Sequence, residues 1–149
     1  MGNSKKKGGN YDRDEAKFLT KVTGVEWYRV GVSSGARGTT TNNSIEAWVG
    51  DVFTDNVHFK DIVIEAKAYS SFKITDFYRE KSDFRKWISQ SEKESDGKDW
   101  ALFFKINNQG QYVVTPGYRF CDLFSVDFKT DIVIEIFIDN NHYYLERID

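Results

Sequence analysis

Two carboxylates and one ammonium group occur in the sequence at spacings that suit a metal-assisted hydrolysis. Asp51 follows Gly50 at the head of an apolar stretch, and Glu65 and Lys67 lie within a run of β-type residues from 62 to 68. Alternate residues of a strand share a face, so Glu65 and Lys67 are expected to project together. If the two runs pair as neighbouring strands, Asp51 and Glu65 can share one divalent cation through hard oxygen ligands.

This combination of side chains indicates cleavage of a phosphodiester bond. That reaction needs a nucleophile made from water, neutralisation of the charge on the phosphoryl oxygens and stabilisation of the leaving alkoxide, and Mg²⁺ can assist all three. Lys67 would stand beside the attacking water, where it could orient the water or accept its proton. Mn²⁺ is a second candidate cation, because it also binds carboxylate and water oxygens.

A repeated segment shows how little a Glu on a strand means alone. The sequence Asp-Ile-Val-Ile-Glu occurs at 61–65 and again at 131–135, but only the first copy has a Lys two residues after its Glu. An isolated Glu-x-Lys is more often the solvated face of a half-exposed strand. The first copy is distinguished by Lys67 and by the upstream Gly50 and Asp51.

Composition limits the classes of protein to consider. A chain of 149 residues with 40% hydrophobic residues fits one domain with a single core. The net charge of −2 argues against coating of nucleic acid through bulk charge, so contacts with DNA must come from local basic patches. The single cysteine, Cys121, excludes an internal disulfide. The longest apolar runs are strand-sized, so we expect an intracellular protein without a membrane segment.

The order of elements predicts a short tail and one α/β domain. Residues 1–10 are expected to form a flexible basic tail, either a phosphate-binding arm with Lys5, Lys6 and Lys7 or merely a solubilising end. Residues 11–149 should form a single domain with a central mixed β-sheet flanked by helices. The periodicity predicts helices over 11–21 and 76–94, and strands over 27–32, 47–54, 59–68, 100–106, 111–115, 132–138 and 142–148.

Four segments together resemble the PD-(D/E)xK nuclease superfamily. They are Lys-Gly-Gly-Asn-Tyr-Asp-Arg-Asp at 7–14, Arg29 with Ser-Ser-Gly-Ala at 33–36, Gly-Asp-Val at 50–52, and Ile-Glu-Ala-Lys at 64–67. Within the superfamily the sequence is most similar to archaeal-type Holliday junction resolvases, which carry a Lys-Gly segment, an Arg-x-x-x-Ser-Gly loop, an Asp and a Glu-x-Lys strand. The likeness covers roughly residues 7–70 in its motifs, and residues 116–149 have no counterpart.

The resemblance implies a restriction-endonuclease-like core and a role for each matching residue. Asp51, Glu65 and Asp12 would hold the Mg²⁺, and Lys67 would position or deprotonate the water. Asp12 stands where the family usually has a Glu, so Glu15, one turn further along, is the alternative ligand. Gln90 falls where many of these nucleases carry Gln. The residues expected to contact DNA phosphates are Arg13, Arg29, Ser34 and Arg37, beside the three tail lysines. The stretch from 37 to 44 is an insertion relative to the family.

The resemblance therefore implies a metal-dependent, structure-selective DNA endonuclease. The specific expectation is a Holliday junction resolvase that acts on four-way junctions as a homodimer, in the cytoplasm or nucleoid of a prokaryotic or virus-infected cell. A two-fold axis between subunits would place two sites for paired cuts in opposed strands. The alternatives are a restriction-type or DNA-end-processing nuclease of the same superfamily, and a non-catalytic module that binds nucleic acid.

Overall fold

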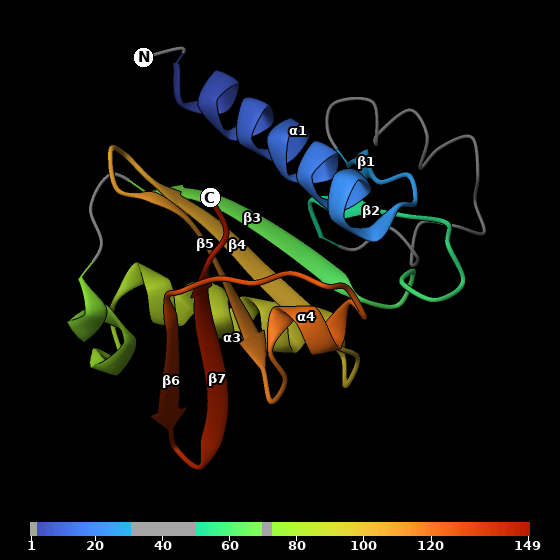
Figure 1. The fold of residues 1–149 in the computed structure, drawn as a ribbon. Coiled ribbons are helices and arrows are strands. Elements are labelled where there is room, and N and C mark those ends of the chain that lie inside the picture. Colours follow the sequence, from blue (N-terminus) through green and yellow to red (C-terminus); the bar gives the residue numbers. More distant parts are fainter. Residues whose placement is uncertain (1–2, 31–49, 70–72) are drawn as a thin grey trace.

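A seven-stranded mixed sheet forms the centre of the molecule in the computed structural model, which describes residues 3–30, 50–69 and 73–149. Helix α1 (Asn3–Thr23) covers one face of the sheet and helix α3 (Asp83–Ser95) covers the other, as Figure 1 shows. The predicted α/β class with a central mixed sheet flanked by helices is confirmed.

The strands lie in the order β1-β2-β3-β4-β5-β7-β6. Strands β3 and β4 run parallel, and every other neighbouring pair of named strands is antiparallel. Helix α3 supplies the crossover that a parallel pair requires. The bounds are Tyr28–Arg29 for β1, Val52–Phe53 for β2, Val63–Tyr69 for β3, Trp100–Ile106 for β4, Gly110–Pro116 for β5, Val133–Ile138 for β6 and Asn141–Arg147 for β7.

Two apolar cores form, one on each face of the sheet. Ile64 and Ala66 of β3 pack in the core that contains α1, whereas Val63 packs in the core that contains α3. Since side chains alternate along a strand, Glu65 must point to the α3 side. Strand β4, which lies beside β3, is apolar on both faces because helices cover both.

Helix α1 begins at Asn3, eight residues before the predicted start at Tyr11. The expected boundary between a tail and this helix was therefore wrong as a statement about secondary structure. Lysine has a good helix propensity, and extending an existing helix costs less than nucleating one, so Lys5, Lys6 and Lys7 continue the helix backwards despite the two glycines after them. The separation of residues 1–10 from a domain of 11–149 stays a prediction.

The helix predicted over 76–94 is two elements, the 3₁₀-helix η2 (Ile74–Tyr78) and helix α3. Ser82 separates them. Its side-chain oxygen accepts a hydrogen bond from the Arg85 N–H at 3.2 Å, which makes it the N-cap of α3. Its hydroxyl also donates to the carbonyl oxygen of Asp76 at 2.6 Å, so the chain turns between the two helices instead of continuing as one.

Three predicted strands in the N-terminal half differ from their expected bounds. In the predicted strand 59–68 only the part from Val63 is extended, because Phe59 and Lys60 form a turn whose N–H groups donate to the carbonyl oxygen of Asn56. The predicted strands 27–32 and 47–54 are represented by β1 and β2, and residues 31–32 and 47–49 lie outside the described residues. By contrast, β4 has the predicted bounds.

The C-terminal segment, for which no counterpart was expected, extends the central sheet. After β5 a short helix, α4 (Phe120–Leu123), precedes the hairpin of β6 and β7, and β7 pairs with β5. Figure 1 shows this hairpin projecting from the end of the sheet. The buried carboxylate of Glu146 ties β7 to α4, since Arg119 binds it at 3.1 Å and the Phe120 N–H donates to it at 2.7 Å.

Candidate active site

Gly50 allows Asp51 to approach β3 closely. Its φ is +99°, which favours glycine, and a Cβ atom at this position would lie 2.5 Å from the carbonyl oxygen of Ile64. The Asp51 N–H donates to that same oxygen at 2.7 Å. A side chain at position 50 would therefore push Asp51 away from β3.

The carboxylate of Asp51 is held by the backbone of its neighbours. The Ala66 N–H donates to Oδ2 of Asp51 at 2.8 Å, and the carbonyl oxygen of Asp51 accepts from the Val30 N–H at 2.8 Å. Strand β2 pairs with β3 through Val52 and Ile64. The two acidic runs thus lie side by side, as the sequence argument required, and the side chain of Asp51 also shares a hydrogen bond with that of Glu65.

Glu65 and Lys67 lie on one face of β3. Nζ of Lys67 is 3.9 Å from Oε2 of Glu65, so the expected projection of the two side chains toward the same side is confirmed. Glu65 is only 3% exposed, whereas Lys67 is half-buried. This arrangement leaves the ammonium group at the open side of the site.

A third carboxylate, that of Glu94 from the last turn of α3, reaches the same place. Glu94 shares a hydrogen bond with Glu65, and Nε2 of Gln90 donates to Oε1 of Glu94 at 2.9 Å. Gln90 was singled out from the sequence, but Glu94 was missed. The four-residue spacing from Gln90 places both on one helix face and was the signal available.

The crowding of carboxylates controls their protonation. Burial, followed by the hydrogen bond with Glu94 and the charge of Asp51, raises the pKa of Glu65 to about 10. The same hydrogen bond lowers the pKa of Glu94. Because the buried member of the pair keeps the proton, Glu65 donates to the Glu94 carboxylate when no cation is present. A cation among these oxygens would reverse this preference and favour the ionised form.

These oxygens fit a hard divalent cation. Asp51 and Glu65 converge from adjacent strands with Glu94 beside them, and carboxylate oxygens are the ligands that Mg²⁺ accepts while it keeps several waters. Among the described residues, no three His, Cys, Asp or Glu side chains form a complete cation cluster.

Glu15 of α1 lies on the opposite face of the sheet from Glu65. Glu15 is fully buried on α1, the helix that packs on the sheet face opposite to Glu65. The side chain of Asp12 is outside the described part of the molecule. Besides burial, the described groups that raise the pKa of Glu65 are Glu94 and Asp51. A ligand from α1 therefore stays a prediction for both residues.

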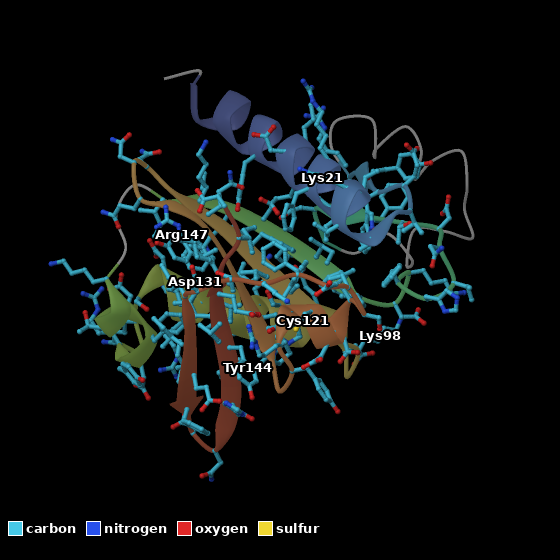
Figure 2. All side chains as sticks on the ribbon, in the orientation of Figure 1. Lys21, Lys98, Cys121, Asp131, Tyr144 and Arg147 are labelled. Carbon is cyan, nitrogen blue, oxygen red and sulfur yellow. The ribbon has the colours of Figure 1, made fainter. Side chains whose placement is uncertain are left out.

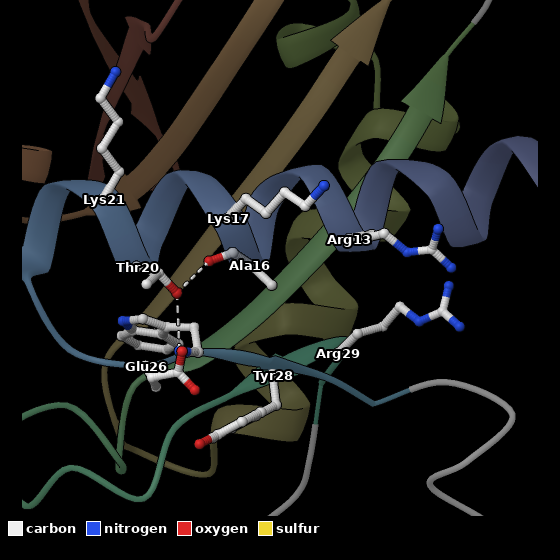
Figure 3. Close-up of a pocket in the computed structure, with 9 residues that line it drawn as sticks. Arg13, Ala16, Lys17, Thr20, Lys21, Glu26, Tyr28 and Arg29 are labelled. Atoms are coloured by element: carbon white, nitrogen blue, oxygen red, sulfur yellow. Dashed lines mark hydrogen bonds between the residues drawn. The ribbon is translucent and has the colours of Figure 1, made fainter.

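Two of the predicted phosphate contacts come together. Arg13 of α1 and Arg29 of β1 line one pocket, and Figure 3 shows their guanidinium groups next to each other. Ser34 and Arg37 lie outside the described residues, as do the side chains of Lys5, Lys6 and Lys7. Lys17 and Lys21 line the same pocket and were not anticipated, although their spacing from Arg13 places all three on one helix face.

None of the helices in residues 3–30, 50–69 and 73–149 combines the length and the apolar character that crossing a membrane requires.

Comparison with known families identifies the kind of protein. The family model described as "Phage putative PDDEXK endonuclease" matches residues 3–147. No curated protein and no solved structure shows significant similarity to the chain. The matched span includes Asp51, strand β3 with Glu65 and Lys67, and the whole of α3. The chain therefore belongs to this phage PDDEXK endonuclease family, within the PD-(D/E)xK superfamily.

Proposed function

We propose that this nuclease is a divalent-metal-dependent DNA endonuclease whose site comprises Asp51, Glu65 and Lys67. The observation that carries the proposal is the convergence of Asp51 and Glu65 from paired strands, with the Lys67 ammonium group 3.9 Å from the Glu65 carboxyl. The family match supports the class of activity and its dependence on a divalent cation.

Each side chain has a definable task in the proposed reaction. Asp51, oriented by the Ala66 N–H, and Glu65 would hold Mg²⁺, or Mn²⁺ in its place. The bound cation supplies neutralisation of the scissile phosphate and a lowered pKa for a ligated water. Lys67 orients that water toward phosphorus or accepts its proton. Glu94 and Gln90 hold the Glu65 carboxyl in place from the helix side.

The finer proposal concerns the substrate. The motifs at 7–14, 33–36, 50–52 and 64–67 are most similar to those of archaeal-type Holliday junction resolvases, so we assign four-way DNA junctions as the substrate and a homodimer as the acting form. Two sites related by a two-fold axis would cut opposed strands of one junction. Arg13, Arg29, Ser34, Arg37 and the lysines at 5–7 are proposed to contact phosphates, with affinity that falls as salt rises.

Cleavage of synthetic four-way junctions beside a plain duplex of the same arm sequence tests this assignment. With Mg²⁺ we expect paired nicks in opposed strands of the junction and little cutting of the duplex, and with EDTA no cutting of either. Equal cleavage of junction and duplex would remove the junction assignment and leave the endonuclease. Undiminished cleavage in EDTA would remove the metal-dependent mechanism.

A restriction-type or end-processing nuclease is the rival, because the description of the matched family does not specify junctions. A closed circular duplex and the same duplex after linearisation separate the possibilities. Cutting at a fixed sequence in both forms indicates the restriction type, and cutting of the linear form alone indicates end processing. The presence of Asp51, Glu65 and Lys67 argues against a non-catalytic binding module.

A further inference from the structure

Tyr28 of β1 lies on the same face of the sheet as the candidate active site. The residues on either side of it face α1, since Trp27 packs in the core beneath α1 and Arg29 lines a pocket with Arg13. Because side chains alternate along a strand, Tyr28 points to the opposite face. Figure 3 shows its ring directed away from α1. Tyr28 therefore shares a face with Glu65, which points to the α3 side.

The strand register places Tyr28 close to Asp51. Tyr28 is directly opposite Phe53 in the antiparallel pair of β1 and β2, and Asp51 comes two residues before Phe53. The hydrogen bond from the Val30 N–H to the carbonyl oxygen of Asp51, at 2.8 Å, shows that the pairing continues as far as Asp51. Diagonal neighbours across such a pair lie about 7–8 Å apart, which is within reach of an aromatic side chain.

The ring of Tyr28 is supported from below. It is half-buried and packs against the ring of Phe53, with 5.5 Å between centroids, and Phe53 itself is 6% exposed. A tyrosine has only two side-chain torsions, so a ring that already rests on a buried neighbour loses little freedom when it binds a ligand. Its hydroxyl is thus a preorganised donor beside the carboxylates.

Helix α3 does not extend over this part of the face. The core beneath α3 takes side chains from β3 to β7 but, among the described residues, none from β1 or β2. In the described part of the chain, DNA can therefore approach the carboxylates over β1 and β2. Strand β1 is at the edge of the sheet, and the proposed phosphate contacts Arg13 and Arg29 lie on the other side of that edge. A DNA strand that runs from the cleavage position toward these arginines passes Tyr28.

We propose that Tyr28 positions the DNA strand by donating a hydrogen bond from its hydroxyl to a phosphate next to the scissile one. Tyrosine is among the side chains that contact DNA phosphates, and such contacts fix the register of the nucleic acid on the protein. Because the hydroxyl is neutral, the contact adds affinity without releasing a counterion. This inference rests on the proposed function, since it assumes that DNA is cut at Asp51 and Glu65.

Fluorescence anisotropy with a labelled four-way junction in EDTA tests the contact without cleavage. Tyr28→Phe keeps the ring and its packing on Phe53 and should weaken binding about 3-fold to 10-fold, with an unchanged salt dependence. Arg29→Ala should instead reduce the salt dependence by about one counterion. The matched control is Tyr144→Phe, which should bind as the parent does. Tyr144 is also half-buried, its ring packs on His142, and Figure 2 shows it on β7, in the hairpin at the other end of the sheet.

A scan of the junction with single methylphosphonates, each of which replaces one charged phosphate oxygen by a methyl group, locates the accepting phosphate. At that phosphate the change should weaken binding of the parent more than binding of Tyr28→Phe, because the variant has already lost the hydrogen bond. If Tyr28→Phe binds as tightly as the parent, or if no phosphate shows this shared loss, the proposal is wrong. A protein that shows the shared loss but does not cut DNA with Mg²⁺ would instead count against the proposed function alone.

Discussion

Glu65 and Glu135 occupy the same position in two identical five-residue segments but have different environments in the fold. Both follow Asp-Ile-Val-Ile, yet Glu65 is buried beneath α3 on a central strand, and Glu135 is exposed on β6 at the edge of the sheet. The sequence favoured Glu65 over Glu135 as a site residue because only Glu65 is followed by a Lys two residues later, but it did not predict that Glu65 is buried and Glu135 exposed. The participation of Glu94 was not predicted either, because it depends on how α3 packs on the sheet, which no local pattern specifies.

Glu65→Gln should abolish cleavage and stabilise the cation-free protein. Loss of a cation ligand costs several kcal/mol of transition-state stabilisation, so we expect the rate to fall about 100-fold or more. In EDTA the unfolded state loses the Glu65 proton near pH 4.5, whereas the folded state keeps it up to a pKa of about 10, so Glu65 lowers the free energy of unfolding as pH rises through that window. The amide should therefore raise the free energy of unfolding by roughly 1–3 kcal/mol at about pH 8 and leave it unchanged below about pH 4.

Urea unfolding in EDTA and junction cleavage in Mg²⁺ measure the two effects. Glu135→Gln is the matched control, since it alters the same five-residue sequence at an exposed position and should change neither quantity. A Glu65→Gln protein that cleaves at the parent rate would show that Glu65 is not a ligand.

Glu94→Gln should have a weaker effect, on cation affinity more than on rate. Glu94 adds negative charge beside Glu65 and hydrogen-bonds to it, but it is only partly buried. Mutation of a residue that hydrogen-bonds to a metal ligand typically weakens cation affinity 10-fold to 100-fold. Because Glu94 is partly exposed, we expect Glu94→Gln to weaken Mg²⁺ affinity by about 3-fold to 10-fold. The measurement is the Mg²⁺ concentration for half-maximal cleavage, with exposed Glu80→Gln as the control. An unchanged Mg²⁺ dependence would exclude Glu94 from the site.

At the scale of elements, the bounds predicted from the sequence were most accurate where the pattern of apolar residues was uniform along the whole element. Strand β4 could be located to the residue because its apolar side chains pack on both faces. The break between η2 and α3 could not, since the apolar positions keep a helical spacing across it and the turn depends on Ser82 reaching back to Asp76. The pairing of β2 with β3, on which the site depends, was stated as a condition and is confirmed.

Gly50→Ala tests whether the close approach of this turn to β3 positions Asp51. The added Cβ would lie 2.5 Å from the Ile64 carbonyl oxygen, so the backbone must move and the hydrogen bond from the Asp51 N–H must lengthen or break. A displacement of about 1 Å in a catalytic group can cost 100-fold in rate. We expect that loss in the cleavage assay, with a stability loss of roughly 1–3 kcal/mol from backbone strain.

Gly24→Ala is the control that separates the steric clash of an added Cβ with β3 from the strain of a positive φ. Gly24 also has a positive φ, of +76°, but a Cβ there meets no atom within 4 Å. This variant should lose stability from strain alone, and its cleavage should match that of the parent at a temperature where both are folded. If both alanine variants cleave equally, the contact of Gly50 with β3 does not position the site.

At the scale of the molecule, the C-terminal segment completes the sheet. Residues 116–149 had no counterpart in the resembling family, and the β6–β7 hairpin within them extends the sheet beside β5. The topology could not be read from the sequence because β7, not β6, pairs with β5, and strand order depends on long-range packing. The buried carboxylate of Glu146, 1% exposed, connects β7 to the start of α4.

Arg119→Ala should destabilise the whole domain. Glu146 would keep the Phe120 N–H but lose the guanidinium that binds it at 3.1 Å, and an uncompensated buried charge typically costs about 3–5 kcal/mol. Chemical denaturation measures the loss. The control is Arg147→Ala, which removes the more exposed pair with Asp149 and should lower the free energy of unfolding much less than Arg119→Ala does. Equal losses for the two variants would mean that the Arg119 pair does not anchor the C-terminal segment.

The candidate active site and the pocket lined by Arg13 and Arg29 both lie at the end of the sheet formed by β1, β2 and β3, the active site on the face covered by α3 and the pocket on the face covered by α1. This edge is where we place the DNA. The rest of the sheet, including the C-terminal hairpin, supports it from the far end.

A crystal grown with Mn²⁺, with the anomalous signal used to locate the cation, tests most directly whether Asp51 and Glu65 share one ion. We predict an anomalous peak about 2.0–2.5 Å from a carboxylate oxygen of each residue, on the side of the sheet that faces Glu94. A peak bound elsewhere, or none between these two side chains under conditions in which the same protein cuts DNA with Mn²⁺, would contradict the account.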